Sequence, residues 1–343
     1  MRLFKKQPDF IPGPGGLNLI EKLNLGDIEQ SILIQAEDPE NPVMLFLHGG
    51  PSLPLPGVSS RGRDYTIVTN TKELIKHFVL VFWDQRGTGK AYHPDIPAKN
   101  MGIAQFVDDT LELTDYLRER FNQQKIYLAA HSWGTILGML AVDRSPEKYF
   151  SYTGLSQIVN WVENDRLGLI WAKEEAVKRN NKKALDELNS VGEPPFNDSF
   201  ERWAVLRRWQ QRFGTLIYSD HEIKHPGIKK MASDMILSPD YSLSDVYNSF
   251  VKGFKLIYTP SFIRDIAVID FKVNIPAVNL PVTFIHGTRD VHVHGSQVKD
   301  YFEGLRAEQG KKLIWVEKSS HVFHPDDTLL IQQYFIDQLK QRT

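Results

Sequence analysis

The chain has 343 residues, 41% hydrophobic and 24% charged, which is an ordinary globular composition that allows one large domain with an insertion. Its formal net charge of −1 gives no general attraction to nucleic acid or to anionic membranes. Because it contains no cysteine, disulfides, a thiolate nucleophile and cysteine-ligated metals are excluded.

Residues 1–8 are basic but lack the apolar core of a signal peptide. The sequence contains no run of about 18 apolar residues that could cross a bilayer. We therefore expect a cytoplasmic protein without a membrane span.

Two short apolar runs, 43–47 and 78–83, end in the loops His48-Gly49-Gly50-Pro51 and Asp84-Gln85-Arg86-Gly87. Continuous apolar runs that end in glycine or proline are typical of strands buried on both faces of a mainly parallel sheet. Apolar residues at helical spacing across 103–121 then predict an amphipathic helix.

The most informative segment is the strand-like run 126–131, which ends abruptly at Ser132 and is followed by an apolar, helix-like run. This pattern predicts a nucleophile elbow, a sharp turn that exposes the serine hydroxyl at its tip. Gly134 fits the expected small position after the nucleophile, and Ala130 replaces the usual glycine before it. An ordinary Ser-Gly turn is the alternative.

Residues 158–275 break the alternation of strands and helices, because they are rich in helix formers and charge. Gly192-Glu193-Pro194-Pro195 marks a turn between two helical stretches. Strand-like runs return at 281–285 and 313–316, and a closing helix is expected near 328–339. We therefore expect an α/β fold with helices on both faces of the sheet, divided into core residues 1–157, a helical insertion at 158–275 and core residues 276–343.

A catalytic serine needs a base, and the base needs an orienting carboxylate. Asp290 follows the strand run 281–285, and His321 follows the run 313–316, so both lie on loops at the carboxyl ends of strands. The order Ser132, Asp290, His321 is the one expected for this kind of sheet.

Three other histidines, at positions 324, 292 and 294, compete for the role of base. His292 and His294 could also form a metal pair, but no third ligand has convincing spacing. We therefore predict no metal and no cofactor.

Two backbone N–H groups must stabilise the negative charge that develops on the substrate carbonyl oxygen. We assign them to Gly50, where glycine lets the backbone approach a ligand closely, and to Trp133, the residue after the nucleophile. A simple Gly-Gly-Pro turn is the alternative for Gly50.

Together these motifs resemble the prolyl aminopeptidase (proline iminopeptidase) family of α/β-hydrolases, peptidase family S33, over residues 40–157 and 278–343. The resemblance implies a serine hydrolase with a helical cap, which suits the insertion, and supports Gly50 and Trp133 as oxyanion donors. It places the loop of Asp84 and Arg86 near the site, where we expect both residues to have a structural role.

Some positions depart from that family. Ser52 stands where glycine is usual, and Ala91 stands where serine is usual. The family reads the substrate's free amine with cap glutamates, one of them in an Asn-Glu-Phe sequence that this chain lacks. Four glutamates of the predicted insertion are candidates for that role: Glu163, Glu174, Glu175 and Glu201. A solvated helix position is the alternative for each.

The resulting prediction is a serine hydrolase that cleaves an amide or ester through an acyl-enzyme, with an aminopeptidase acting on small peptides as the first choice. A carboxylesterase or amidase is the second, and a non-catalytic ligand-binding protein is the third. Two similar motifs are set aside. The segment 86–91 lacks the first glycine and the final Ser or Thr of a phosphate loop, and epoxide hydrolases attack with an aspartate where this chain has Ser132. The partner is a small molecule or a short peptide, and the oligomeric state is not predicted.

Overall fold

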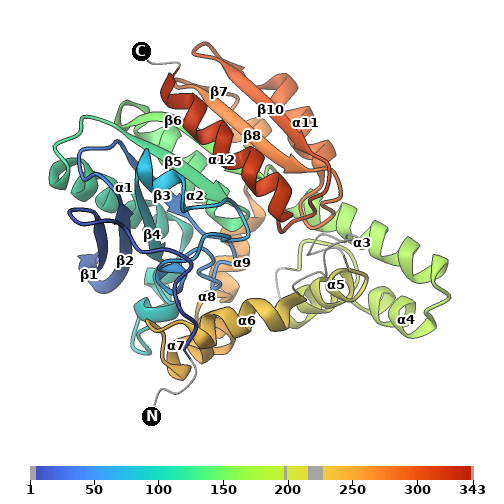
Figure 1. Ribbon diagram of the computed structural model, residues 1–343. Coiled ribbons are helices and arrows are strands. Elements are labelled where there is room, and N and C mark those ends of the chain that lie inside the picture. The colour runs from blue at the N-terminus through green and yellow to red at the C-terminus, as the bar shows by residue number, and fades with distance from the viewer. Residues whose placement is uncertain (1–4, 197–198, 215–226, 341–343) are drawn as a thin grey trace.

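The computed structural model describes residues 5–196, 199–214 and 227–340 (Figure 1). At its centre lies an eight-stranded sheet in the order β1-β2-β4-β3-β5-β6-β8-β10. β2 pairs antiparallel with β1 and β4, and the other neighbours are parallel. The strands span Leu17–Leu25 (β1), Ile28–Ala36 (β2), Val43–Leu47 (β3), Val79–Asp84 (β4), Ile126–His131 (β5), Tyr149–Leu155 (β6), Val282–Gly287 (β8) and Lys311–Val316 (β10).

The strands expected at the four apolar runs and before Ser132 are confirmed as β3, β4, β5, β8 and β10. The hairpin of β1 and β2 and the strand β6 were missed. The sequence held a local signal for the hairpin, the pair Gly26-Asp27 between the two strands. In the structure both residues have positive φ, at 52° and 64°, as a tight two-residue turn requires.

Side chains on each buried strand alternate between two apolar layers. Leu45 and Leu47 face a layer that includes α1 (Ile103–Arg120), α2 (Trp133–Arg144) and α11 (Gly295–Gly304). Phe46 faces the opposite layer, where its ring meets that of Phe335 on α12 (Pro325–Lys340) at 5.6 Å. Both faces of the sheet are therefore covered, which explains the uninterrupted apolar runs. The predicted helices near 103–121 and 328–339 are confirmed as α1 and α12.

Between β6 and β7 (Ala277–Val278) the described chain forms helices and no named strand. Their bounds are Trp161–Lys178 (α3), Lys182–Ser190 (α4), Phe200–Arg212 (α5), Gly227–Leu237 (α6), Leu243–Tyr247 (α7), Gly253–Ile257 (α8), Pro260–Ala267 (α9) and Phe271–Asn274 (α10), with a π-helical turn at Asn248–Lys252. The turn predicted at 192–195 falls between α4 and α5. In Figure 1, α3, α4 and α5 project from the body of the molecule. β7 pairs only with the short β9 (Arg306–Ala307).

The two ends of this helical segment meet. Asn160 and Asp270 form an isolated antiparallel bridge, and the Phe271 N–H donates to the Val159 carbonyl at 2.9 Å. This closure supports the proposed division at 158–275, which stays a proposal.

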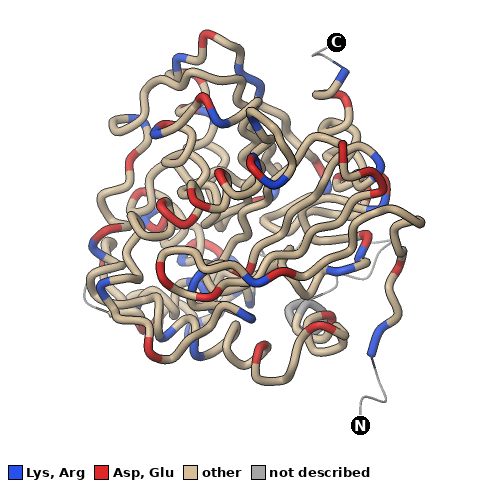
Figure 2. Tube along the Cα trace, turned by 90° about the vertical axis from the view of Figure 1, so that its left-hand side faces the viewer, with Lys and Arg blue, Asp and Glu red and all other residues tan. Residues whose placement is uncertain are grey.

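None of the helices in the described ranges combines the length and apolar character needed to cross a membrane. Residues 1–4, which belong to the basic segment 1–8, lie outside the described residues. Figure 2 shows basic and acidic residues interspersed along the chain, in keeping with the near-zero net charge.

A buried ion pair fastens the loop after β4 to α1. Arg86 and Asp109 are both fully buried and form two hydrogen bonds, of 2.8 and 2.9 Å. Arg86 also donates to the Gly26 carbonyl in the β1–β2 turn at 2.9 Å, and Gln30 donates to Asp109 at 2.6 Å. One guanidinium thus joins three segments, which agrees with the structural role expected for Arg86.

We predict that Asp109→Ala lowers the free energy of unfolding by about 3–5 kcal/mol, because it leaves the Arg86 charge buried without its partner. The matched control is Glu29→Ala, which removes an exposed ion pair with Lys22 and should cost less than about 1 kcal/mol. Urea unfolding of both variants at pH 7.5 measures the difference. Equal losses would contradict the prediction.

Candidate active site

Ser132 occupies a strained turn between β5 and α2, with φ at 51° and ψ at −119°. The helix starts so close to the neighbouring strand that a Cβ on Gly134 would lie 2.4 Å from the Leu47 carbonyl oxygen. The need for a small residue at position 134 is therefore confirmed. The turn lifts the Ser132 side chain above the carboxyl ends of the strands.

The structure brings Ser132, Asp290 and His321 together from three separate loops. The Ser132 Oγ lies 2.9 Å from the Nε2 of His321, and the Nδ1 of His321 lies 2.9 Å from the Asp290 Oδ2. Asp290 follows β8 and His321 follows β10, as the sequence predicted. Because an ionised carboxylate can only accept, Nδ1 carries the ring proton and Nε2 is left to accept the serine proton.

Asp290 is almost fully buried, and burial alone would raise its pKa. The charge of His321 and the hydrogen bond from its ring outweigh burial and hold the pKa of the carboxyl well below its usual range. The other oxygen, Oδ1, accepts the backbone N–H groups of His292 and Val293 at 2.8 and 3.0 Å. The carboxylate therefore stays charged and fixed in orientation.

The competing histidines have other surroundings. The His292 ring lies 5.5 Å from that of His321, and burial lowers the pKa of His292 well below 6.5. His324 is buried, and its Nδ1 accepts the Asp326 N–H at 3.1 Å. Neither of these rings is hydrogen-bonded to Ser132. Across the described ranges, no three His, Asp or Glu side chains are grouped so that they could hold a metal ion.

Side chains of the helical segment form hydrogen bonds with the loop that carries Asp290. The Asn164 side chain on α3 donates to the His292 carbonyl at 2.6 Å and accepts the His294 N–H at 2.9 Å. Gln210 on α5 donates to the Val291 carbonyl at 3.0 Å. Sequence reasoning missed both residues, because nothing in their local pattern points to a loop more than 80 positions away.

The backbone beside Ser132 supplies two unused donors. Within the described chain, neither the Gly50 N–H nor the Trp133 N–H donates a hydrogen bond to another group. A Cβ on Gly49 would lie 3.2 Å from the Ser132 Cβ, so the glycine loop rests against the elbow. Gly50 has φ at 121°, and a Cβ there would lie 2.4 Å from the Ser52 nitrogen, so only glycine fits.

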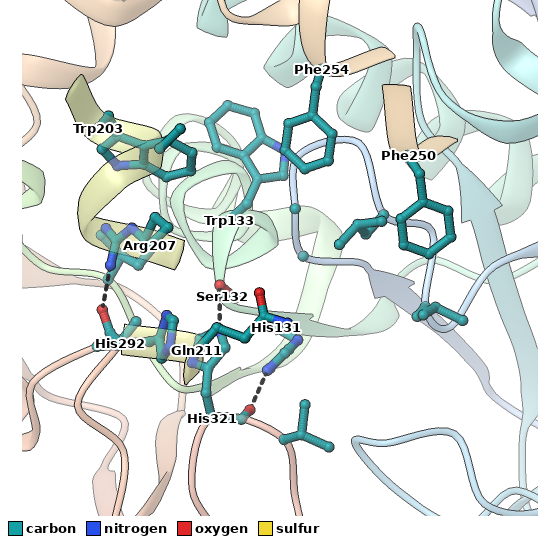
Figure 3. A pocket seen from close by; sticks show the side chains of 18 of the residues that line it. His131, Ser132, Trp133, Trp203, Arg207, Gln211, Phe250, Phe254, His292 and His321 are labelled. Carbon is teal, nitrogen blue, oxygen red and sulfur yellow. Dashed lines mark hydrogen bonds between the residues drawn. The ribbon is translucent and has the colours of Figure 1, made fainter. Parts of the chain in front are cut away.

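Ser132 opens into a cavity of about 630 Å³ between the sheet edge and the helical segment (Figure 3). Much of the wall is aromatic: Trp133, Trp161, Phe200, Trp203, Phe250 and Phe254. The charged groups in the wall are Arg207, Arg208 and Lys255, and the described lining includes no Asp or Glu. A buried partner, Asp165, pairs with Arg207, whose guanidinium lies over the Trp203 ring at 5.1 Å.

The four candidate glutamates do not line this cavity. Glu163 pairs with Arg166, and Glu175 pairs with Arg179 at 2.8 Å. Glu174 and Glu201 are exposed on their helices. Glu174 and Glu201 therefore occupy the solvated helix positions that were the alternative, while Glu163 and Glu175 are partly buried in their ion pairs.

Asp84 holds the loop after β4 in place. Its carboxylate accepts the Val58 and Lys90 N–H groups at 2.8 and 3.0 Å and the Tyr241 hydroxyl at 2.5 Å. Burial raises the pKa of Asp84 to about 6 against these hydrogen bonds. The contacts agree with the structural role expected for this residue.

The serine aminopeptidase family S33 matches this chain over residues 72–166. The probable aminopeptidase YbaC of Bacillus subtilis (strain 168) is 28% identical over 329 residues, covering 93% of this chain and 96% of the relative. A proline iminopeptidase of Mycobacterium smegmatis has a TM-score of 0.62 at 16% identity, covering 94% of this chain and 98% of its own. An epoxide hydrolase from Vigna radiata has a TM-score of 0.51 at 17% identity with the same coverage. The structural matches confirm the predicted fold class.

Buried histidines near the site should make the fold sensitive to acid. Burial lowers the pKa of His48 to about 4, that of His131 to about 3 and that of His292 well below 6.5. Between these values and 6.5 the unfolded chain binds more protons, so stability is lost as pH falls below about 6.5. Asp84 and Asp165, whose pKa values are raised to about 6, act in the opposite direction, since they take up a proton more readily when folded.

We predict that the free energy of unfolding is a few kcal/mol lower at pH 5.5 than at pH 7.5, because the buried neutral histidines, each contributing on the order of 1 kcal/mol, outweigh the two aspartates. Urea unfolding curves at the two pH values measure it. A stability that is equal or higher at pH 5.5 would show that the histidines do not dominate.

Proposed function

We propose that this chain, a prolyl aminopeptidase-like α/β-hydrolase of the S33 type, is a serine hydrolase. It cleaves an amide or ester bond through an acyl-enzyme. The observation that carries the proposal is the hydrogen-bonded series from Ser132 through His321 to Asp290, with its serine facing the large cavity.

In the first step the Ser132 oxygen attacks the substrate carbonyl carbon while His321 Nε2 takes the hydroxyl proton. Asp290 stabilises the imidazolium that forms and keeps the ring in the orientation observed. The N–H groups of Gly50 and Trp133 stabilise the negative carbonyl oxygen. When the tetrahedral intermediate collapses, His321 returns the proton to the leaving amine or alcohol, and the acyl group stays on Ser132.

In the second step a water molecule loses a proton to His321 and attacks the acyl carbon. His321 then returns that proton to the Ser132 oxygen as the bond to the acyl group breaks, which releases the acid. We propose that residues 158–275 act as a cap, because α3 and α5 supply much of the cavity wall and limit the access of bulk water. A cytoplasmic location and a reaction without a cofactor stay predictions from the sequence.

An aminopeptidase that acts on small peptides is the first candidate, and the family match and the name of the Bacillus relative support it. Such an enzyme must recognise a positively charged α-amine. In the described lining, the groups available for that task are uncharged acceptors such as the Asn164 and Gln211 side chains.

A carboxylesterase or amidase is the second candidate, and the charge of the cavity favours it. Lys255 and Arg208, the latter paired with Glu187 at 2.7 Å, are lining cations, while the described lining includes no carboxylate. An aromatic wall without a carboxylate suits an apolar acyl group better than a free ammonium group. An epoxide hydrolase is not proposed, because Ser132 occupies the nucleophile position.

We predict that Ser132→Ala abolishes covalent labelling by a fluorophosphonate probe and lowers kcat by at least about 10⁴-fold, because the attacking oxygen is removed. The control is Ser156→Ala at the end of β6, where a buried hydroxyl has no hydrogen-bond partner among the described residues. Intact-protein mass spectrometry detects the adduct. Labelling that persists in Ser132→Ala would refute the proposed nucleophile, and a folded wild type that never reacts would favour a binding protein.

A substrate panel separates the two candidates. We predict a higher kcat/KM for N-acylated anilides and N-acylated p-nitrophenyl esters than for the same compounds with a free α-amine, because the described lining offers no carboxylate to an ammonium group. Release of p-nitrophenol or p-nitroaniline measures the rates, and Ser132→Ala supplies the background. Preference for free prolyl anilides would instead establish the aminopeptidase.

A further inference from the structure

Gln85, the residue after β4, connects the glycine loop that begins at His48 to the start of α2 at Trp133. It is fully buried, and its backbone N–H donates to the His48 Nε2 at 3.2 Å. Its side-chain amide donates to the His48 carbonyl at 3.3 Å and accepts the indole N–H of Trp133 at 3.0 Å. Since an indole N–H can only donate, the amide oxygen must face Trp133 and the amide nitrogen must face His48.

The same logic fixes the His48 ring. Because the Gln85 N–H can only donate, Nε2 is the acceptor and the ring proton lies on Nδ1. Nδ1 is 2.6 Å from the Gly49 carbonyl oxygen, to which it donates. Burial lowers the pKa of His48 to about 4, so this neutral form persists at neutral pH.

The Gly49 carbonyl belongs to the same planar peptide group as the Gly50 N–H. A hydrogen bond that holds this carbonyl therefore also sets the direction of the Gly50 N–H. Two successive glycines leave that peptide free to rotate unless a side chain holds it. The His48 ring supplies this restraint from one side of the peptide, and the cavity lies beside the glycines.

The second oxyanion donor, the Trp133 N–H, starts α2. Its own side chain is buried, packs on the Phe262 ring at 5.3 Å and is held at the indole nitrogen by Gln85. Gln85 thus contacts the residue that carries one donor and, through His48, the peptide that carries the other.

We propose that Gln85 and His48 are positioning residues that hold the Gly50 and Trp133 N–H groups at a fixed separation, so that both point at the developing oxyanion. This inference rests on the proposed function, and it assigns a role in the reaction to two side chains that do not touch the substrate. Preorganised donors of this kind act on the transition state more than on the bound substrate.

The chain contains a matched control. Gln30 is also a fully buried glutamine whose side-chain oxygen accepts a tryptophan indole N–H, that of Trp83, at 3.0 Å. It lies on β2 and is not among the described residues that line the cavity. Gln30→Leu and Gln85→Leu therefore each remove a buried indole contact. The first also removes the hydrogen bond to Asp109, and only the second removes hydrogen bonds to His48 and Trp133.

The test measures the rate at which a fluorophosphonate modifies Ser132. Attack on this probe forms an oxyanion in the position proposed for the substrate's oxyanion, so the test requires no knowledge of the natural substrate. We expect Gln85→Leu to lower the maximal rate constant of labelling about 10- to 100-fold without raising the concentration of half-maximal effect. Gln30→Leu should change the rate less than about threefold at a comparable loss of Tm. Equal rate losses in the two variants would overturn the inference and leave the proposed function standing.

A second pair of variants tests the His48 step. His48→Asn places an amide N–H near the position of Nδ1 and should retain labelling within about tenfold of wild type, whereas His48→Ala should fall as far as Gln85→Leu. If the labelling rates of both variants fall equally, or if both stay near that of wild type, the proposed restraint on the Gly49 peptide is contradicted. A wild type that is not labelled at all would instead refute the proposed function.

Discussion

The strained turn at Ser132 is the constraint on which the rest of the site depends. A residue with φ at 51° is unfavourable outside glycine, and the turn persists because β5 is buried on both faces and α2 packs directly against Leu47. The rigid sheet therefore holds the serine in a position that a flexible loop could not maintain. Asp290 and His321 reach it because the strands that precede them, β8 and β10, are parallel to β5 and end at the same edge.

Electrostatic order in this site comes from burial combined with specific partners. Asp290 remains charged in a buried position because His321 and two backbone N–H groups compensate for the lost water. His131 experiences the opposite balance, since burial lowers its pKa to about 3 and its Nε2 lies 3.0 Å from the His321 carbonyl. A neutral His131 therefore supports the backbone of His321 without placing a positive charge beside its ring.

The sequence was sufficient for the parts of the fold that follow from local pattern. Short apolar runs located five strands, and the order of serine, acid and base followed from loop positions after those strands. Strand β6, Tyr149–Leu155, was missed because serine, threonine and two tyrosines interrupt its apolar character. Asn164 and Gln85 were missed for a different reason: their partners lie 128 and 48 positions away, and only the folded chain shows which backbone groups they meet.

Contacts between the helical segment and the core connect the cavity wall to Asp290. Asn164 and Arg207 line the cavity, and both donate to the His292 carbonyl, at 2.6 and 3.4 Å. The N–H of that same residue is donated to Asp290. A substrate that displaced α3 or α5 would therefore have to break hydrogen bonds to the loop that orients the carboxylate. The cavity wall and the loop that carries Asp290 thus form one hydrogen-bonded unit, so under the proposed function substitutions in the wall should alter the rate of the chemical step as well as binding.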